Sequence, residues 1–205
     1  MLKLWGRSNS INVQKPMFAL AELGLAYERV DAGLSFGIVG TPEYRALNPN
    51  GAIPTLEHDD FVVWESNTIV RYLAATFGDE HFWPADPRAR ARQDMWMDWQ
   101  QTVLNWPVTI CFWGLVRFPG GKTPEEIEAA RKQAEAAVDL LEAWLVERSY
   151  VAGERFGMAD CVLAPTLHRW LHMPCERQRR PHLERYHARV MERDSAKEIL
   201  TLPLT

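Results

Sequence analysis

The chain has 205 residues, of which 47% are hydrophobic and 24% are charged, and its formal net charge is -4. This composition is typical of a globular protein of one or two domains, and it excludes a disordered chain and a basic nucleic-acid-binding protein. The three cysteines include no CxxC pair, so they indicate neither a disulfide framework nor a zinc site. Without a signal-peptide pattern or an apolar run of roughly 20 residues, we expect a soluble, cytoplasmic protein with no membrane partner.

The first thirty residues predict a strand, a helix and a second strand. Residues 2–5 and 27–31 are interpreted as short strands, and residues 12–23 have helical spacing that ends at Gly24, a good helix C-terminal residue. A strand, a helix and a strand over this length indicate a parallel crossover of right-handed sense.

A hairpin and a helix are predicted next. After a connecting stretch with one helical turn near residues 42–47, two apolar runs at 53–57 and 61–64 are separated by His58-Asp-Asp, which is suitable for a tight turn. A helix over residues 66–77 follows. We therefore expect an α/β domain over residues 1–79.

Trp83-Pro-Ala-Asp-Pro contains two prolines and predicts a linker over residues 80–86, and residues 87–205 predict a domain of helices only. Asp86-Pro87 is typical of a helix start, and Pro107 should kink or break that helix. Thr123-Pro-Glu-Glu matches a capping box at the start of a long helix, on which Glu128 and Lys132 can pair. Two more helices are expected, near 158–172 and 182–193.

Two motifs in the first domain resemble those of one enzyme family. Asn48-Pro-Asn-Gly-Ala-Ile-Pro-Thr-Leu resembles the NPxGxxPxL signature of cytosolic glutathione transferases. Eleven residues after Pro54, Glu65-Ser-Asn-Thr-Ile-Val-Arg-Tyr-Leu is similar to the ESxAIxxYL motif of the same family. The resemblance implies the glutathione transferase fold: a thioredoxin-like domain that binds glutathione, followed by an all-helical bundle.

The same resemblance assigns roles to four residues. It implies a cis peptide bond between Ile53 and Pro54, which would let the backbone of Ile53 pair with the cysteinyl unit of glutathione like an added strand. Ser66 at a helix start would hold the γ-glutamyl carboxylate with its hydroxyl and amide, and Glu65 would face the γ-glutamyl ammonium. Without a ligand, Ser66 would be an ordinary N-cap and Pro54 an ordinary loop proline.

The residue that activates the glutathione thiol stays open between Ser10 and Asn12. Family members place a Tyr, Ser, Cys or Asn in the loop after the first strand, and here that loop contains no Tyr and no Cys. A hydrogen-bond donor at this point would lower the thiol pKa from roughly 8.5. Asn12 could equally be the N-cap of the following helix and Ser10 a loop residue, and Arg7 is a further candidate that could favour the thiolate.

The second substrate is expected to be a small apolar electrophile, in a pocket between the domains. The expected lining comprises a group of side chains on one helix, although each could instead be a core residue: Trp106, Phe112, Trp113, Val116 and Arg117.

The resemblance implies the function of a glutathione S-transferase, with glutathione as co-substrate, and we expect the protein to form a homodimer. A glutathione-dependent peroxidase or disulfide reductase, or a non-catalytic glutathione-binding protein, could use the same site. No metal is expected. His168 and His172 are four residues apart, but without the glutamate of HExxH a surface or core role is favoured. The arginine-rich stretch 177–189 predicts a solvated helix and its approach, and Gly157 stands where the family usually has Ser or Thr.

Overall fold

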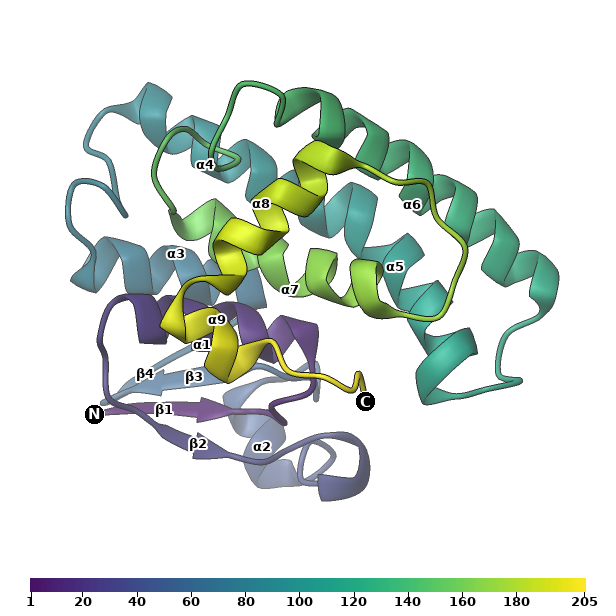
Figure 1. Ribbon diagram of the computed structural model, residues 1–205. Helices are drawn as coiled ribbons and strands as arrows, with labels where there is room; N and C mark the ends of the chain where they lie inside the picture. The colour runs from purple at the N-terminus through teal and green to yellow at the C-terminus, as the bar shows by residue number, and fades with distance from the viewer. The chain divides into compact units, whose positions relative to one another are not determined.

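The computed structural model describes residues 1–205 and divides into two compact units, Met1–Trp83 and Pro84–Thr205 (Figure 1). All four strands lie in the first unit, and the second unit is helical. The boundary falls within the segment 80–86, between Trp83 and Pro84. No helix is both long and apolar enough to cross a membrane.

The first unit is built on a mixed sheet of four strands in the order β2-β1-β3-β4. β1 pairs with β2 in parallel, and β3 is antiparallel to both β1 and β4, which confirms the predicted crossover and hairpin. Leu4 lies at the centre of the sheet, paired with Arg29 on one side and Leu56 on the other. The strands are β1 (Leu2–Trp5), β2 (Glu28–Val30), β3 (Thr55–His58) and β4 (Phe61–Trp64).

Three helices cover this sheet. α1 (Ile11–Glu22) and α3 (Ser66–Phe77) pack against each other on one face, and α2 (Pro42–Leu47) lies on the other (Figure 1). A short 3₁₀ turn, η1 (Leu34–Phe36), lies between β2 and α2. The side chains between α1, α3 and the sheet are fully buried, so burial of apolar surface holds these layers together. They include Leu4, Phe18, Leu20, Leu56, Ile69 and Leu73.

The second unit contains helices only. α7 is its central helix, since every residue from Met158 to Trp170 is buried. Asp86 caps α4 as expected, because its carboxylate accepts hydrogen bonds from the backbone amides of Arg88 and Ala89 at 3.1 and 3.2 Å. The helices are α4 (Pro87–Trp99), α5 (Asn105–Phe112), α6 (Pro124–Trp144), α7 (Met158–His172), α8 (Pro181–Met191) and α9 (Asp194–Ile199).

Pro107, which was expected to kink or break its helix, does not break it. It lies inside α5, and the helical path continues because the wider π-helical segment η2 (Gln100–Leu104) comes just before it. Pro107 has no amide to bond the carbonyl of Val103, and in an α-helix its ring would clash with that carbonyl. The π-helical turn accommodates both defects. A second π-helical segment, η3 (Trp113–Arg117), extends the path beyond α5.

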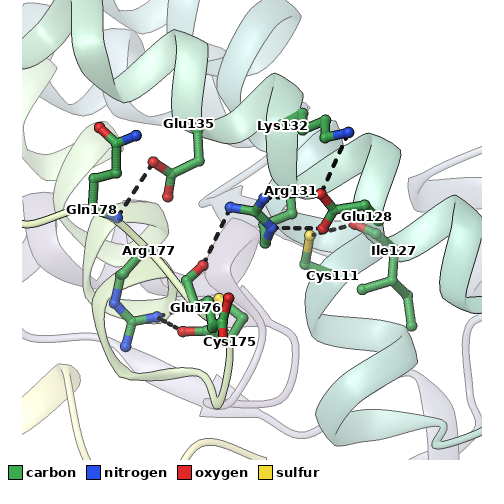
Figure 2. Close-up of polar contacts among 10 residues, drawn as sticks. All are labelled: Cys111, Ile127, Glu128, Arg131, Lys132, Glu135, Cys175, Glu176, Arg177 and Gln178. Carbon is green, nitrogen blue, oxygen red and sulfur yellow. Dashed lines mark hydrogen bonds and ion pairs between the residues drawn. The ribbon is translucent and has the colours of Figure 1, made fainter.

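The capping box at the start of α6 is confirmed. The Thr123 hydroxyl accepts from the Glu126 amide at 3.2 Å, and the Glu126 carboxylate accepts from the Thr123 amide at 2.8 Å. The expected pair of Glu128 with Lys132 is present at 3.6 Å, and Arg131 binds the same carboxylate at 2.7 Å. Figure 2 shows both cations on the two oxygens of Glu128.

The arginine-rich stretch is not simply solvated, which corrects the expectation for it. Arg180 is buried and its guanidinium binds the Glu135 carboxylate of α6 at 2.5 Å. Gln178 also donates its backbone amide to Glu135, and Arg131 donates to the carbonyl of Glu176 (Figure 2). These contacts fasten the segment between α7 and α8 along α6, which a count of arginines could not reveal.

The helix predicted near 182–193 is confirmed as α8, and a further short helix, α9, follows it that the sequence did not predict. α8 ends at Met191, and α9 starts at Asp194 after Arg193 adopts an extended backbone with φ of -74° and ψ of 140°. No glycine or proline marks this break in the sequence, so local pattern could not locate it.

Candidate functional site

The loop before β3 is held in place by hydrogen bonds of Asn48 and Tyr44. The Asn48 side-chain amide donates to the carbonyl of Ala52 at 2.9 Å and to the hydroxyl of Thr55 at 3.1 Å. The Tyr44 hydroxyl bonds the same two groups from α2, at 2.8 and 2.9 Å. Gly51 is required at the turn because its φ is +59° and a Cβ there would lie 2.9 Å from a backbone carbonyl.

The peptide bond between Ile53 and Pro54 is cis, as the sequence motif implied. The Ile53 amide takes part in none of the backbone hydrogen bonds of the sheet or its loops, and β3 starts only at Thr55. Arg7 and Ile53 lie together, since a Cβ on Gly33 would come within 3.1 Å of both side chains. The loop just before β3 therefore presents the unpaired backbone amide of Ile53 next to the guanidinium group of Arg7.

The N-terminus of α3 is not closed by a side chain. Glu65 occupies the N-cap position with φ of +70°, a conformation that costs a non-glycine residue about 1–3 kcal/mol, and its side chain makes no capping hydrogen bond. Ser66 follows as the first residue of the helix and is 5% exposed. Its predicted role as N-cap is wrong by one position, because Glu65 holds that place.

Lys15 is the member of this site that the sequence analysis missed. It is fully buried on α1, and its ammonium donates to the Ser66 hydroxyl at 3.4 Å and to the Asn67 side-chain carbonyl at 3.2 Å. Burial lowers the pKa of Lys15 to about 7, and the nearby charge of Glu65 partly opposes this. The one sequence signal for Lys15 was its position four residues before Ala19, where a lysine interrupts the otherwise apolar, buried face of α1.

Ser10 and Asn12 both lie at the start of α1, but their places differ from expectation. Ser10, not Asn12, is the N-cap, and α1 begins at Ile11. Ser10 is only 8% exposed, and yet its side chain makes no capping hydrogen bond. Its hydroxyl group can therefore donate to another acceptor. The side-chain carbonyl of Asn12 is buried without a partner, and so is Nε of Arg7. Burial also lowers the pKa of Arg7.

Comparison with known proteins places this arrangement in a family. Residues 1–75 match the glutathione S-transferase N-terminal domain, and residues 124–189 match the glutathione S-transferase C-terminal domain. Glutathione S-transferase GstB of Escherichia coli is 38% identical over 100% of both chains. The chain belongs to the glutathione S-transferase family.

Solved structures agree with this family over the full length. A theta class glutathione S-transferase from Xanthomonas axonopodis pv. citri, determined with glutathione bound, has a TM-score of 0.95 and 40% identity, covering 100% of this chain and 99% of its own. A glutathione S-transferase from Pseudomonas fluorescens has a TM-score of 0.86 and 29% identity over 99% and 98% of the two chains. The fold of this family member is thus the glutathione S-transferase fold.

The helical-unit residues of this family member differ in exposure. Trp106 is 54% exposed and meets Trp113 edge to face, with ring centroids 5.7 Å apart. Phe112 is fully buried between the guanidinium groups of Arg117 and Arg169, which lie 4.7 and 3.9 Å from its ring. Phe112 is therefore a core residue of the helical unit.

The remaining predicted residues of this group are half-buried on η3. Val116 and Arg117 are both partly exposed, and Arg117 also donates to the backbone oxygen of Thr205. η3 packs closely on α6, because a Cβ on Gly114 would lie 2.6 Å from the Ile127 side chain. Trp106, Trp113, Val116 and Arg117 thus share one stretch of helix with accessible surface.

Proposed function

We propose that this family member binds glutathione on its first unit and conjugates it to small apolar electrophiles. The observation that carries the proposal is the N-terminus of α3, where Ser66 lies beside the buried ammonium of Lys15 and no side chain caps the helix. A helix N-terminus with free positive potential is suited to a carboxylate.

The γ-glutamyl carboxylate is bound by Ser66 with Lys15 behind it. Because the Ser66 oxygen accepts a hydrogen bond from Lys15 at 3.4 Å, its own hydroxyl proton is directed to another acceptor. The Lys15 charge adds an attraction for the same carboxylate from within the protein. Glu65, exposed at the N-cap, is suited to the ammonium of the same γ-glutamyl unit.

The cysteinyl unit pairs with Ile53. Its backbone amide and carbonyl, set by the cis bond to Pro54, lie just before β3 starts, and the Ile53 amide takes part in no backbone hydrogen bond of the protein. Arg7, placed next to Ile53 around Gly33, adds a cation at this end of the peptide.

The thiolate accepts a hydrogen bond from Ser10, with Asn12 in support. Ser10 stands at the N-terminus of a twelve-residue helix with its hydroxyl uncommitted, and both features stabilise an anion. Asn12 contributes a side-chain amide one position inside the helix. The thiolate then attacks an electrophilic carbon, forming a sulfur–carbon bond as the leaving group departs with the electron pair.

The second substrate binds on the accessible, largely apolar surface formed by Trp106, Trp113, Val116 and Arg117. The protein works in the cytoplasm as a homodimer. The accessible edge-to-face tryptophan pair supports an aromatic substrate, since such pairs accept flat rings. Peroxidase or reductase chemistry could use the same site, because glutathione itself supplies the reacting thiol. The first unit holds no cysteine that could take that role.

The test measures glutathione binding by calorimetry, then conjugation of a chlorodinitrobenzene and reduction of an organic hydroperoxide. We expect Ser10→Ala to lower kcat/KM for conjugation by about 100-fold, the usual effect of removing one donor to a developing or bound anion, and Asn12→Ala to have a smaller effect. The ultraviolet absorbance of bound thiolate should decrease in Ser10→Ala at neutral pH.

Three outcomes would overturn parts of this proposal. Absence of glutathione binding at millimolar concentration would exclude the whole of it. Binding without turnover would indicate a glutathione-binding protein, and faster hydroperoxide reduction than conjugation would favour the peroxidase function. A larger loss in Asn12→Ala than in Ser10→Ala would exchange the roles of the two residues.

A further inference from the structure

Three histidines meet in the helical unit, which contains none of the residues assigned to glutathione. His168 and His172 are one turn apart on α7, and His187 faces them from α8. Their ring centroids are 4.3 to 5.3 Å apart, and one nitrogen from each ring lies within 4.8 Å of the others. From the sequence only the pair on α7 was visible, because His187 is distant along the chain.

We infer that His168, His172 and His187 form a binding site for one transition-metal ion, of which Zn²⁺ is the representative. Imidazole nitrogens suit Zn²⁺, Cu²⁺ and Ni²⁺, whereas Mg²⁺ and Ca²⁺ require oxygen ligands. Three histidines with one position left for water is a common zinc arrangement. HExxH-type spacing is not needed for such a site, since the third ligand here comes from another helix.

Hydrogen bonds already orient one of the rings as a ligand. Nδ1 of His172 lies 2.8 Å from the carbonyl oxygen of His168, and because a carbonyl can only accept, Nδ1 carries the proton. Nε2 of His172 therefore presents a lone pair. A backbone carbonyl that holds the far nitrogen of a ligating histidine is the usual outer contact of a zinc site.

The other two rings share a single hydrogen bond. Nδ1 of His168 and Nε2 of His187 are 3.0 Å apart, so one of them donates its proton to the other. When a metal binds both atoms, that proton moves to the second nitrogen of its own ring. The ion then exchanges three of its water ligands for three histidine nitrogens, and the protein loses only the hydrogen bond between His168 and His187. No proton has to leave the site.

The site is accessible from solvent. His168 is buried, His187 is half-buried and His172 is exposed. A cavity of about 360 Å³ opens beside them and is lined by His172, His187, Leu183 and Glu184 among others. An ion can therefore enter from the His172 side, and water can occupy its remaining position.

Arginines on the same cavity do not exclude a cation, because carboxylates neutralise most of their charge. Arg180 is bonded to Glu135 at 2.5 Å, and Arg179 pairs with Glu184 at 3.3 Å. Arg177 is held by the carbonyl of Met173 at 2.9 Å, which fixes it on the loop after α7.

The test uses tag-free, full-length protein that has been stripped with a chelator and studied without glutathione. Titration calorimetry with ZnCl₂ should show one ion per chain with micromolar or tighter affinity. Titration with CoCl₂ should give the visible absorbance of a low-coordinate, nitrogen-ligated ion. Zn²⁺ should also raise Tm, because it binds the folded chain.

Single substitutions identify the ligands. His172→Ala and His187→Ala should each weaken Zn²⁺ binding at least about tenfold, whereas His182→Ala, on α8 but outside the cluster, should not. His172 is exposed, so its variant should fold and carries the test even if His187→Ala does not. Equal Zn²⁺ affinity in the wild type, His172→Ala and His182→Ala would overturn the inference, as would the absence of the cobalt absorbance.

Discussion

The N-termini of α3 and α7 are built in opposite ways, and the contrast separates a site from a scaffold. At α3 the chain leaves the helix uncapped, keeps Glu65 at a φ of +70° and buries the ammonium of Lys15. Each of these features costs folding free energy. At α7 the polar groups are paired within the protein.

The closed N-terminus of α7 depends on Asp160. Its carboxylate accepts from the amides of Gly157 and Val151 at 2.9 and 3.2 Å, and from the Tyr186 hydroxyl at 2.9 Å. Burial raises the pKa of Asp160 to about 6 despite these hydrogen bonds. The N-terminus of α7 is thus satisfied internally, whereas that of α3, where we propose that glutathione binds, is left incomplete.

Gly157 is explained by a neighbouring helix. A Cβ at Gly157 would lie 2.4 Å from the amide nitrogen of Gln93, which comes from α4. The oxygen of the same side-chain amide accepts a hydrogen bond from the backbone amide of Ala159 at 3.0 Å, as a serine or threonine cap would. Gln93 therefore takes the place of a hydroxyl cap at the start of α7.

The largest effect that we predict follows from Asp160→Ala. The substitution leaves three buried donors without an acceptor, so the free energy of unfolding should fall by about 3 kcal/mol or more. Denaturant unfolding measures this, with Asp194→Ala as the control because Asp194 is fully exposed. A loss below about 1 kcal/mol would remove the distinction between the two helix ends.

The next largest effect concerns the exchange of caps at α7. Gly157→Ser should destabilise the protein by roughly 1–3 kcal/mol, because its side chain overlaps Gln93. Gln93→Ala alone should also destabilise, since it frees the Ala159 amide. The double variant should recover most of the loss, and a double-mutant cycle measures the coupling. Additive losses would show that Gln93 is not the substitute cap.

Lys15→Met tests the open end at α3. The variant should bind glutathione about tenfold more weakly, because the charge behind the carboxylate is lost, while its free energy of unfolding should not decrease. Lys132→Met, on the surface of α6, should change neither quantity. A large loss of stability without a change in affinity would make Lys15 a structural residue.

The pH dependence sharpens the same test. Burial holds the pKa of Lys15 at about 7, against a usual value of 10.5. Between these values the unfolded chain binds one more proton than the folded chain, so this residue makes stability increase with pH, and Lys15→Met should remove that increase. Affinity for S-methylglutathione, which has no thiol to titrate, should fall as pH rises through about 7 in the wild type but not in the variant.

The sequence predicted the elements whose signals are local. The bounds of α3 and α7 and the capping box at Thr123 matched the structure, because caps and helical spacing lie within a few residues of one another. Ile53-Pro54 and Ser66 were found because each lies inside a short motif.

Features that depend on distant parts of the chain were missed. Lys15 reaches Ser66 across fifty-one residues and Gln93 reaches Ala159 across sixty-six, so neither contact has a local pattern. His187 joins the pair on α7 only through the packing of α8. The π-helical turn before Pro107 was also missed, because a proline predicts a kink or a break and does not indicate which helical geometry will accommodate it.

The central claim, that the N-terminus of α3 is a ligand site and not a cap, is tested most directly by comparing Ser66→Ala with Thr123→Ala. Both remove one hydroxyl at a helix start, and both variants are measured for glutathione affinity by calorimetry and for stability in denaturant. We predict that Ser66→Ala weakens affinity at least about tenfold with little change in stability, whereas Thr123→Ala costs about 1 kcal/mol of stability and leaves affinity intact. Unchanged affinity in Ser66→Ala, together with a stability loss like that of Thr123→Ala, would contradict the account.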